Sequence, residues 1–277
     1  MLVLTTIAET RDACARLRKE GRTLGLVPTM GALHEGHLSL VRAARAGCDA
    51  VAVSIFVNPT QFGPKEDFAA YPRTIASDCR FLEEAGVDFV FAPSVEEMYP
   101  AGASTFVEVG GLSERLDGAS RPGHFRGVAT VVAKLFHIVS AEQAFFGQKD
   151  AAQVAVLRKM VRDLQFAVQL VVCPTVREAD GLAMSSRNRY LSPEDRGRAV
   201  VLSRALLAVQ ADFQDGERDA AGLLSRALPF LEGSVEVDYF RIVDADTLED
   251  LAEARPGALV AVAARLGATR LIDNLLL

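Results

Sequence analysis

PTMGALHEGH (residues 28–37) joins the apolar run 24–28 to a helical pattern over 36–46, through a turn that contains glycine. Gly47 follows the pattern and is expected to cap the helix at its C-terminus. A buried strand that leads directly into a helix is the unit from which parallel sheets are built. The segment therefore predicts an α/β fold with a strand–turn–helix near its start.

The same alternation continues on the C-terminal side of this segment. VAVSIFV (51–57) is a nearly continuous apolar run, which is typical of a strand buried on both faces of a sheet. Further strands are predicted at 88–93, 144–146 and 166–174, and helices at 74–85, 127–140 and 150–164. Strands that alternate with helices imply right-handed crossovers and a Rossmann-like parallel sheet.

The pattern changes after Val176. A polar loop (177–192) is followed by two predicted helices, 193–213 and 217–231. Three strand candidates then come with the spacing of hairpins, at 235–243, 258–266 and 269–277. We predict a larger α/β domain over 1–176 and a smaller α+β domain over 177–277.

Composition excludes several classes of protein. The 277 residues carry 30 Lys and Arg against 36 Asp and Glu, a net charge of −6 that disfavours sequence-independent binding to nucleic acid. The cysteines (14, 48, 79 and 173) form no C-x-x-C pair, which favours a reducing compartment and disfavours a cysteine-bound zinc. The N-terminus has no basic leader, and no apolar run approaches the ~18 residues that span a bilayer. We predict a cytoplasmic protein with no membrane partner.

His34 and His37 come at the predicted helix start. A helix N-terminus exposes N–H groups that favour an anion, and imidazole donors beside it suit a phosphate. The alternative to a phosphate site is that these are two surface histidines that happen to begin a helix. A zinc protease is disfavoured because its H-E-x-x-H motif needs histidines four residues apart, whereas these are three apart.

H-x-G-H on a strand–loop–helix at the start of an α/β domain resembles the nucleotidyltransferase superfamily. The second signature of that superfamily is a loop of Met, Ser and a basic residue, and AMSSRN (183–188) fits it, although an ordinary interdomain linker would also be polar. Three more motifs narrow the resemblance: FVNPTQFGPKEDFAAYPRT (56–74), RPGHFRGVATVVAKLF (121–136) and FFGQKD (145–150). Together with READGLAMSSRNRYLS (177–192), they resemble the pantothenate synthetase (pantoate–β-alanine ligase) family over about residues 20–195.

The resemblance implies a reaction and a set of residues. (R)-Pantoate and β-alanine would be joined with ATP through a pantoyl adenylate, giving pantothenate, AMP and pyrophosphate. Residues 1–176 would bind ATP and pantoate, and residues 177–277 would form a lid whose 177–192 loop is mobile without nucleotide. The catalytic residues would be His34, His37, Lys149 and Arg187. The ATP contacts would be Met30, His34, His37, Gly147, Lys149, Asp150, Val176, Met184, Ser185, Ser186 and Arg187. The pantoate and β-alanine contacts would be Gln61, Gln153, Tyr71 and Arg121.

The family also implies cofactors and assembly. Mg²⁺ is expected mainly through the ATP phosphates, with the assisting carboxylate unassigned and Asp150 an alternative ribose contact. The family forms homodimers. Members of the family commonly have two consecutive glutamines here, whereas this chain has Ala152 and Gln153. The supporting role of the first glutamine is therefore missing. The rival interpretations are a nucleotidyltransferase with another acceptor, a nucleotide sensor without turnover, and an aminoacyl-tRNA synthetase, for which the chain is short and acidic.

Overall fold

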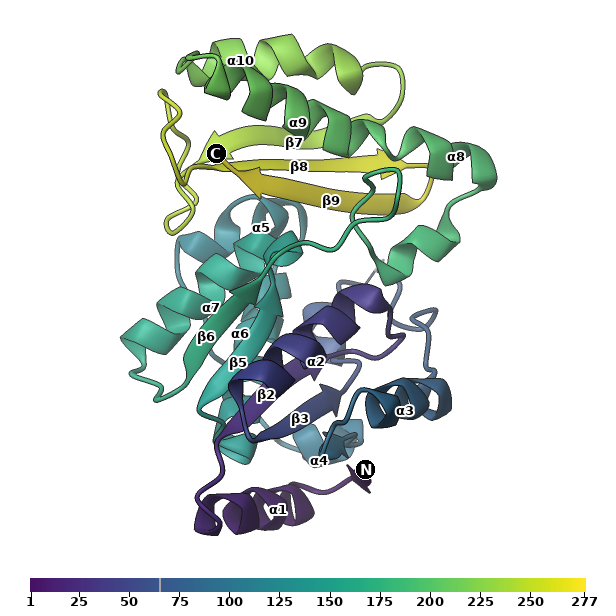
Figure 1. Cartoon of the computed structure of the whole chain (residues 1–277), viewed down its shortest axis with the longest axis vertical. Helices are drawn as coiled ribbons and strands as arrows, with labels where there is room; N and C mark the ends of the chain where they lie inside the picture. Colours follow the sequence, from purple (N-terminus) through teal and green to yellow (C-terminus); the bar gives the residue numbers. More distant parts are fainter. Residues whose placement is uncertain (65) are drawn as a thin grey trace.

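The computed structural model describes residues 1–64 and 66–277 (Figure 1); Lys65, within the 56–74 motif, lies outside the described residues. The strands are β1 Leu2–Leu4, β2 Leu24–Thr29, β3 Ala50–Ile55, β4 Phe89–Phe91, β5 Gln143–Gly147, β6 Gln169–Cys173, β7 Glu236–Val243, β8 Leu259–Leu266 and β9 Thr269–Leu276. The α-helices are α1 Ile7–Lys19, α2 Glu35–Gly47, α3 Ile75–Glu84, α4 Val95–Met98, α5 Asp117–Ser120, α6 His124–Val139, α7 Ala151–Asp163, α8 Pro193–Arg198, α9 Val201–Gln214 and α10 Ala220–Ala227. Short 3₁₀ turns include Pro59–Gln61, Gln148–Asp150 and Ser186–Tyr190.

The first six strands form one parallel sheet in the order β1-β4-β3-β2-β5-β6. From β2 the chain adds β3 and β4 on one side, and it later adds β5 and β6 on the other side. The strand order therefore reverses between β2 and β5. Ligands of open α/β sheets bind at such a reversal, outside the carboxyl ends of the strands. The predicted parallel α/β sheet is confirmed.

Successive residues of the central strands point into two different cores, as the strand period of two requires. Leu26 and Ala52 pack with α6 and α7 on one face of the sheet, whereas Val27 and Val53 pack with α2 on the other. Both pairs are buried at 0% exposure, which explains why these strands read as unbroken apolar runs.

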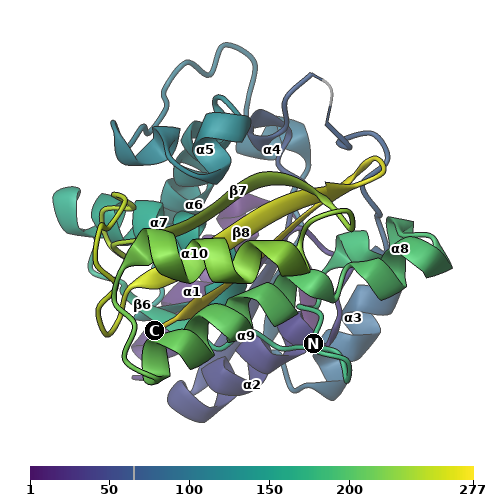
Figure 2. The ribbon, with the colours of Figure 1, turned by 90° about the horizontal axis from the view of Figure 1, so that it is seen from above.

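The last three strands form an antiparallel sheet in the order β7-β8-β9. Helices α9 and α10 lie over this sheet, as Figure 2 shows from above, and share a core with Val260 and Val262. Leu259 and Ala261 alternate with those residues and join the core of the larger sheet. The predicted α+β tail is confirmed, while the boundary at residue 176 stays a prediction.

Three local expectations were wrong. Gly47 does not cap α2: the helix includes it and Cys48 is the cap, in an extended conformation. The helix predicted over 193–213 is two helices, because Leu202 N–H bonds to the carbonyl of Ala199, three residues back, and this breaks the i→i−4 ladder. The helix predicted over 217–231 begins only after Asp219, whose side chain caps it, and ends in a 3₁₀ turn around Pro229.

The N-terminal elements β1 and α1 were missing from the sequence-based prediction. A capping box was their signal, since Thr6 accepts from the backbone of Glu9 and the Glu9 side chain accepts from the backbone of Thr6. The short helices α4 and α5 were also missed. Within residues 1–64 and 66–277, no helix has both the length and the apolar character needed to cross a bilayer.

Candidate active site

A cavity of about 230 Å³ opens at the carboxyl ends of β2, β3, β5 and β6, where the strand order reverses. Every residue proposed from the sequence as a site residue lines it. These are Met30, His34, His37, Gln61, Tyr71, Arg121, Gly147, Lys149, Asp150, Gln153, Val176, Met184, Ser185, Ser186 and Arg187. The fold therefore gathers segments that lie more than 100 residues apart in the chain.

The turn after β2 is held by a buried carboxylate. Asp78 of α3, 1% exposed, accepts the backbone N–H groups of Ala32 and Leu33 at 3.0 Å each. Both Gly31 and Ala32 have positive φ angles, of 82° and 53°. Asp78 thus stabilises a strained turn and fixes where α2 begins. Sequence reasoning did not identify this role.

His34 and His37 cap α2 with their own side chains. His34 Nδ1 accepts the N–H of Gly36 at 3.2 Å, and His37 Nδ1 accepts the N–H of His34 at 3.3 Å. A Cβ on Gly36 would lie 2.9 Å from the His34 ring and would displace it. The glycine of H-x-G-H therefore leaves room for the His34 ring in this position.

These hydrogen bonds also fix the protonation of both rings. Each Nδ1 accepts a hydrogen bond, so each neutral ring carries its proton on Nε2. Burial, and then the positive charge of Lys149, lower the pKa of His34 to about 4. Burial, and then His34, lower the pKa of His37 to about 3. At neutral pH the ligand-free site thus holds two uncharged Nε2–H donors.

Lys149 supplies positive charge on the β5 side of the cavity. It lies in the 3₁₀ turn between β5 and α7, and its side chain is 21% exposed. Its Nζ lies 3.5 Å from Oδ1 of Asp150, whose side chain is 48% exposed. The lysine is therefore partly shielded from water beside a more open carboxylate.

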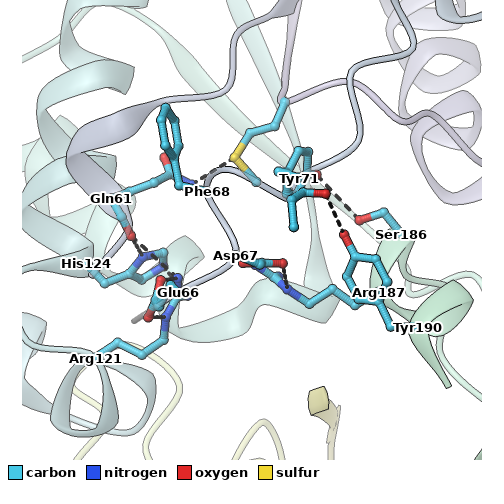
Figure 3. Close-up of polar contacts among 12 residues, drawn as sticks. Gln61, Glu66, Asp67, Phe68, Tyr71, Arg121, His124, Ser186, Arg187 and Tyr190 are labelled. Atoms are coloured by element: carbon cyan, nitrogen blue, oxygen red, sulfur yellow. Dashed lines mark hydrogen bonds and ion pairs between the residues drawn. The ribbon is translucent and has the colours of Figure 1, made fainter. Parts of the chain in front are cut away.

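The segment Met184–Arg187 closes another side of the cavity. Met184 N–H donates to the Val176 carbonyl at 3.0 Å, and Ser185 Oγ accepts the N–H of Arg187 at 3.2 Å. The Arg187 guanidinium pairs with Asp67 at 3.2 and 3.3 Å, as Figure 3 shows. This cation is thus held by the carboxylate of Asp67, which follows the NPTQF sequence in the chain.

The same two segments meet at a second point. Tyr71 Oη and Ser186 Oγ lie 3.4 Å apart, and Tyr190 Oη donates to the Ala70 carbonyl at 3.5 Å (Figure 3). The polar loop at 177–192 therefore lies against the NPTQF-containing motif, and together they cover one side of the cavity.

Gln61 is fixed by residues that sequence reasoning did not single out. Asn58 Nδ2 donates to Gln61 Oε1 at 3.1 Å, and His124 Nδ1 donates to the Gln61 carbonyl at 2.8 Å. Gly127 allows α6 to pack directly against the Thr60–Gln61 backbone, because a Cβ at this position would lie 2.3 Å from the Thr60 carbonyl oxygen. Asn58 and His124 belong to the NPTQF and RPGHFRG motifs, which were the available signal.

Arg121 is engaged with protein groups. It forms a two-point pair with Glu66, at 2.7 Å from Nε and 2.6 Å from Nη2, and its Nη1 donates to His124 Nε2 at 3.0 Å (Figure 3). Burial opposes ionisation of Glu66, but the hydrogen bonds and charge of Arg121 hold the pKa of that carboxyl below its usual value. Burial, and then Arg121, lower the pKa of His124 to about 4.

Two pocket-lining hydroxyls have no hydrogen-bond partner within the part of the chain that the structure describes. Among the described residues, no atom hydrogen-bonds Ser54 Oγ or Thr175 Oγ1, and both atoms are buried. Buried hydroxyls normally find a partner, so these two are suited to a bound ligand or water. Neither was proposed from the sequence.

The site gives little support for a metal held by protein alone. Residues 1–64 and 66–277 contain no cluster of three His, Cys, Asp or Glu side chains placed to hold an ion. Asp150 is the open carboxylate at the cavity. This donor set fits Mg²⁺ bound chiefly by ligand phosphates with one protein carboxylate, which is the ordinary pattern for that ion.

A helix N-terminus, two Nε2–H donors and nearby cations thus meet at the carboxyl edge of a parallel sheet, where α/β enzymes bind ligands, and this arrangement suits a phosphorylated substrate. The chain belongs to the pantoate-beta-alanine ligase family, whose model matches residues 2–276. It therefore ligates pantoate and β-alanine, and the function implied by the sequence resemblance is confirmed.

Individual relatives agree over their whole length. The chain is 65% identical to the pantothenate synthetase of Acidobacterium capsulatum, covering 98% of this chain and 95% of that protein. The crystal structure of pantothenate synthetase from Thermus thermophilus superposes with a TM-score of 0.95, 51% identity and 99% coverage of each chain. A pantoate-beta-alanine ligase from Francisella tularensis, complexed with beta-gamma ATP and beta-alanine, has a TM-score of 0.82, 33% identity and coverage of 100% and 97%.

Proposed function

We propose that the cavity performs the ligation in two steps, with ATP as the activating substrate and pantoyl adenylate as the intermediate. The observation that carries this proposal is the convergence of His34, His37, Lys149 and Ser185–Arg187 on one cavity in a chain of this family. The complex of the Francisella relative with an ATP species and β-alanine supports it.

The chemistry explains why ATP is needed. A carboxylate is a poor acyl donor because its oxygen is a poor leaving group. In the first step a pantoate carboxylate oxygen forms a bond to the α-phosphorus, and the bond from that phosphorus to the bridging oxygen of pyrophosphate breaks. In the second step the β-alanine amine attacks the acyl carbon, AMP leaves with the carboxyl oxygen, and the amine loses a proton. One difficult reaction is thereby divided into two easier ones.

Lys149 offsets charge repulsion in the first step. Two unit charges ~4 Å apart repel by about 4 kcal/mol at an effective dielectric constant near 20, so pantoate and the α-phosphate need fixed positive charge between them. Lys149 lies at the cavity and is largely shielded from water, which strengthens its field.

His34 and His37 act as hydrogen-bond donors toward the phosphates. Their Nε2–H groups are already aligned by the backbone bonds at their Nδ1 atoms, so no reorganisation is needed on binding. Both rings are neutral before binding, so they contribute N–H dipoles, and no net charge, beside the N-terminus of α2. An arriving polyanion favours the protonated form of each ring and so raises its pKa.

Ser185, Ser186 and Arg187 bind the β- and γ-phosphates, with Met184 beside the nucleotide. Arg187 must exchange Asp67 for phosphate to do this, because Asp67 accepts the hydrogen bonds of its guanidinium. Met30, Gly147 and Val176 line the cavity where the adenosine lies.

Gln61 and Gln153 bind pantoate. The Oε1 atom of Gln61 accepts a hydrogen bond from Asn58. Among the described residues, its Nε2 contacts only the weakly accepting sulfur of Met30, at 3.1 Å, and a ligand oxygen can replace this contact. The Gln153 amide lines the cavity and makes no hydrogen bond to another side chain or backbone group within the described ranges. Tyr71 and Arg121 line the same cavity and contribute to binding pantoate and β-alanine.

Asp150, with the phosphates of ATP, would hold Mg²⁺. When bound, it would neutralise charge on the pyrophosphate leaving group. The protein's own contribution is to keep Asp150 open to the cavity beside Lys149.

Three further points extend the proposal. Residues 1–176 form the nucleotide- and pantoate-binding domain, and residues 177–277 the lid domain. The chain assembles as a homodimer, as its family does. It works in the cytoplasm, which its buried or half-buried unpaired cysteines favour.

The deciding experiment is an assay with ATP, Mg²⁺, pantoate and β-alanine, in which each component is omitted in turn. Without β-alanine we expect one equivalent of pantoyl adenylate and pyrophosphate per active site, and β-alanine should then release AMP and pantothenate. AMP release that does not depend on pantoate would indicate another acceptor. ATP binding without any product would indicate a sensor.

A further inference from the structure

Strand β9 brings two buried polar residues, Asp273 and Asn274, to the rear of the active site. They are 2% and 4% exposed. Figure 1 shows β9 on the side of the small sheet that faces β5 and β6. The C-terminal strands contain none of the family motifs noted in the sequence, yet these two side chains reach both phosphate-binding segments of the cavity.

Asn274 holds the turn that carries Lys149. Its Nδ2 donates to the carbonyls of Gln148 and Lys149, at 3.0 and 2.8 Å, and its Oδ1 accepts from Gln148 Nε2 at 3.1 Å. One buried amide thus makes three hydrogen bonds to two successive residues. These bonds fix the backbone from which the Lys149 side chain extends.

Asp273 holds the base of the loop that carries Ser185–Arg187. Its carboxylate accepts from both Nη atoms of Arg177, at 2.7 and 3.0 Å. Arg177 also donates to the Gly181 carbonyl at 3.0 Å, and it pairs with Ala183 across an antiparallel bridge. The carboxylate therefore fixes the two arms of the turn that precedes Met184.

The two anchors are coupled to each other. Asp273 Oδ1 accepts the backbone N–H of Asn274 at 2.8 Å, and Arg177 Nη2 donates to the Asn274 carbonyl at 3.3 Å. A shift of either residue along β9 would move the Lys149 turn and the base of the loop together. The separation between these two parts of the cavity is therefore determined by adjacent residues of one strand.

We propose that Asn274 is a positioning residue for adenylate formation: it sets the location of Lys149, while Asp273 ties the same point of β9 to the Ser185–Arg187 loop. The proposal rests on the proposed role of Lys149 at the α-phosphate. A displacement of ~1 Å in a catalytic group can reduce a rate about 100-fold, so the hydrogen bonds of Asn274 to the carbonyls of Gln148 and Lys149 are enough to matter.

The test is a double-mutant cycle on the adenylation half-reaction, followed in single turnovers with ATP, Mg²⁺ and pantoate and without β-alanine. Asn274→Asp keeps the shape of the side chain but loses both N–H donors. We expect it to lower the adenylation rate at saturating substrates by about 10- to 100-fold, with the dissociation constant of pantoate changed less than about twofold. In a Lys149→Ala background the same substitution should change the rate by less than about twofold.

Two further variants separate positioning from stability. Leu275→Ala, on the same strand, removes packing from the core under α9 and should lower Tm while leaving the adenylation rate unchanged. Gln148→Ala removes one of the three bonds from the other side, so it tests the proposal even if Asn274→Asp fails to fold. It should slow adenylation several-fold in the wild-type background and have no further effect without Lys149.

The outcomes are distinct. Wild-type adenylation in folded Asn274→Asp, or in Gln148→Ala if the former does not fold, would overturn the proposal. So would an undiminished effect in the Lys149→Ala background, because Asn274 would then act independently of the lysine. A wild-type rate for Lys149→Ala alone would instead overturn the role of Lys149 in the proposed function.

Discussion

His37 Nδ1 accepts the backbone N–H of His34 at 3.3 Å, so the side chain of the second histidine satisfies the backbone of the first, which is the N-cap residue of α2. His34 in turn caps the N–H of Gly36. The two rings lie 4.1 Å apart between centroids. Each is oriented by backbone groups, and each is left with its Nε2–H for a ligand.

Gly36→Ala should reduce catalysis without destabilising the fold. The new Cβ would lie 2.9 Å from the His34 ring and would displace it, whereas alanine itself favours the helix. We expect kcat/KM for ATP to fall at least about 10-fold with Tm unchanged or raised. Gly197→Ala in α8, where a Cβ meets no atom within 4 Å, is the matched control and should keep full activity. Equal activity of the two variants would contradict the steric argument.

Lys149→Ala should lower kcat by about 10²- to 10³-fold, because it removes a preorganised cation from the developing charge. Its Tm should stay close to that of the wild type, since its ion pair with Asp150 is half-exposed. Lys159→Ala on the outer face of α7 removes a lysine that pairs with Asp163 and should have no kinetic effect. Steady-state kinetics and thermal melts measure both variants. A loss of Tm in proportion to activity would indicate a structural lysine instead.

Asp67→Asn should tighten ATP binding. Asp67 competes with phosphate for Arg187, and both side chains are partly exposed, at 27% and 30%. Such a pair contributes at most about 1 kcal/mol, so we expect Kd to fall about two- to fivefold. Titration calorimetry with a non-hydrolysable ATP analogue measures the change, with Asp163→Asn as a control away from the cavity. Weaker binding would show that Asp67 assists the nucleotide.

Stability should fall as the pH falls from about 7 toward 4. His124 has a pKa of about 4 in the folded protein and 6.5 as its ordinary value, so between these pH values the unfolded chain binds the proton and the folded one does not. The free energy of unfolding, measured in urea, should therefore fall by about 1–2 kcal/mol less between pH 7 and pH 5 for His124→Gln than for the wild type. An identical slope for the variant and the wild type would exclude this cause.

The sequence alone determined the elements whose signals are local. A buried parallel strand is apolar along its whole length, and a helix start needs a capping pattern, so PTMGALHEGH and VAVSIFV identified the α/β fold without any distant contact. The residues that the motifs proposed for the site all line one cavity, and their roles stay predictions. Helix ends were less accurate: the break at Ala199–Val200 and the late start after Asp219 depend on single hydrogen bonds that the hydrophobic pattern does not reveal.

The tertiary structure alone decided the electrostatic state of the site and its support. Burial makes His34 and His37 neutral, although their types and spacing suggest nothing about charge. Arg187 is held by Asp67, 120 residues away, and Lys149 is placed by Asn274, 125 residues away. Such relationships depend on desolvation and on contacts between segments far apart in the chain. The local residue pattern does not reveal them, because the partners become neighbours only in the folded chain.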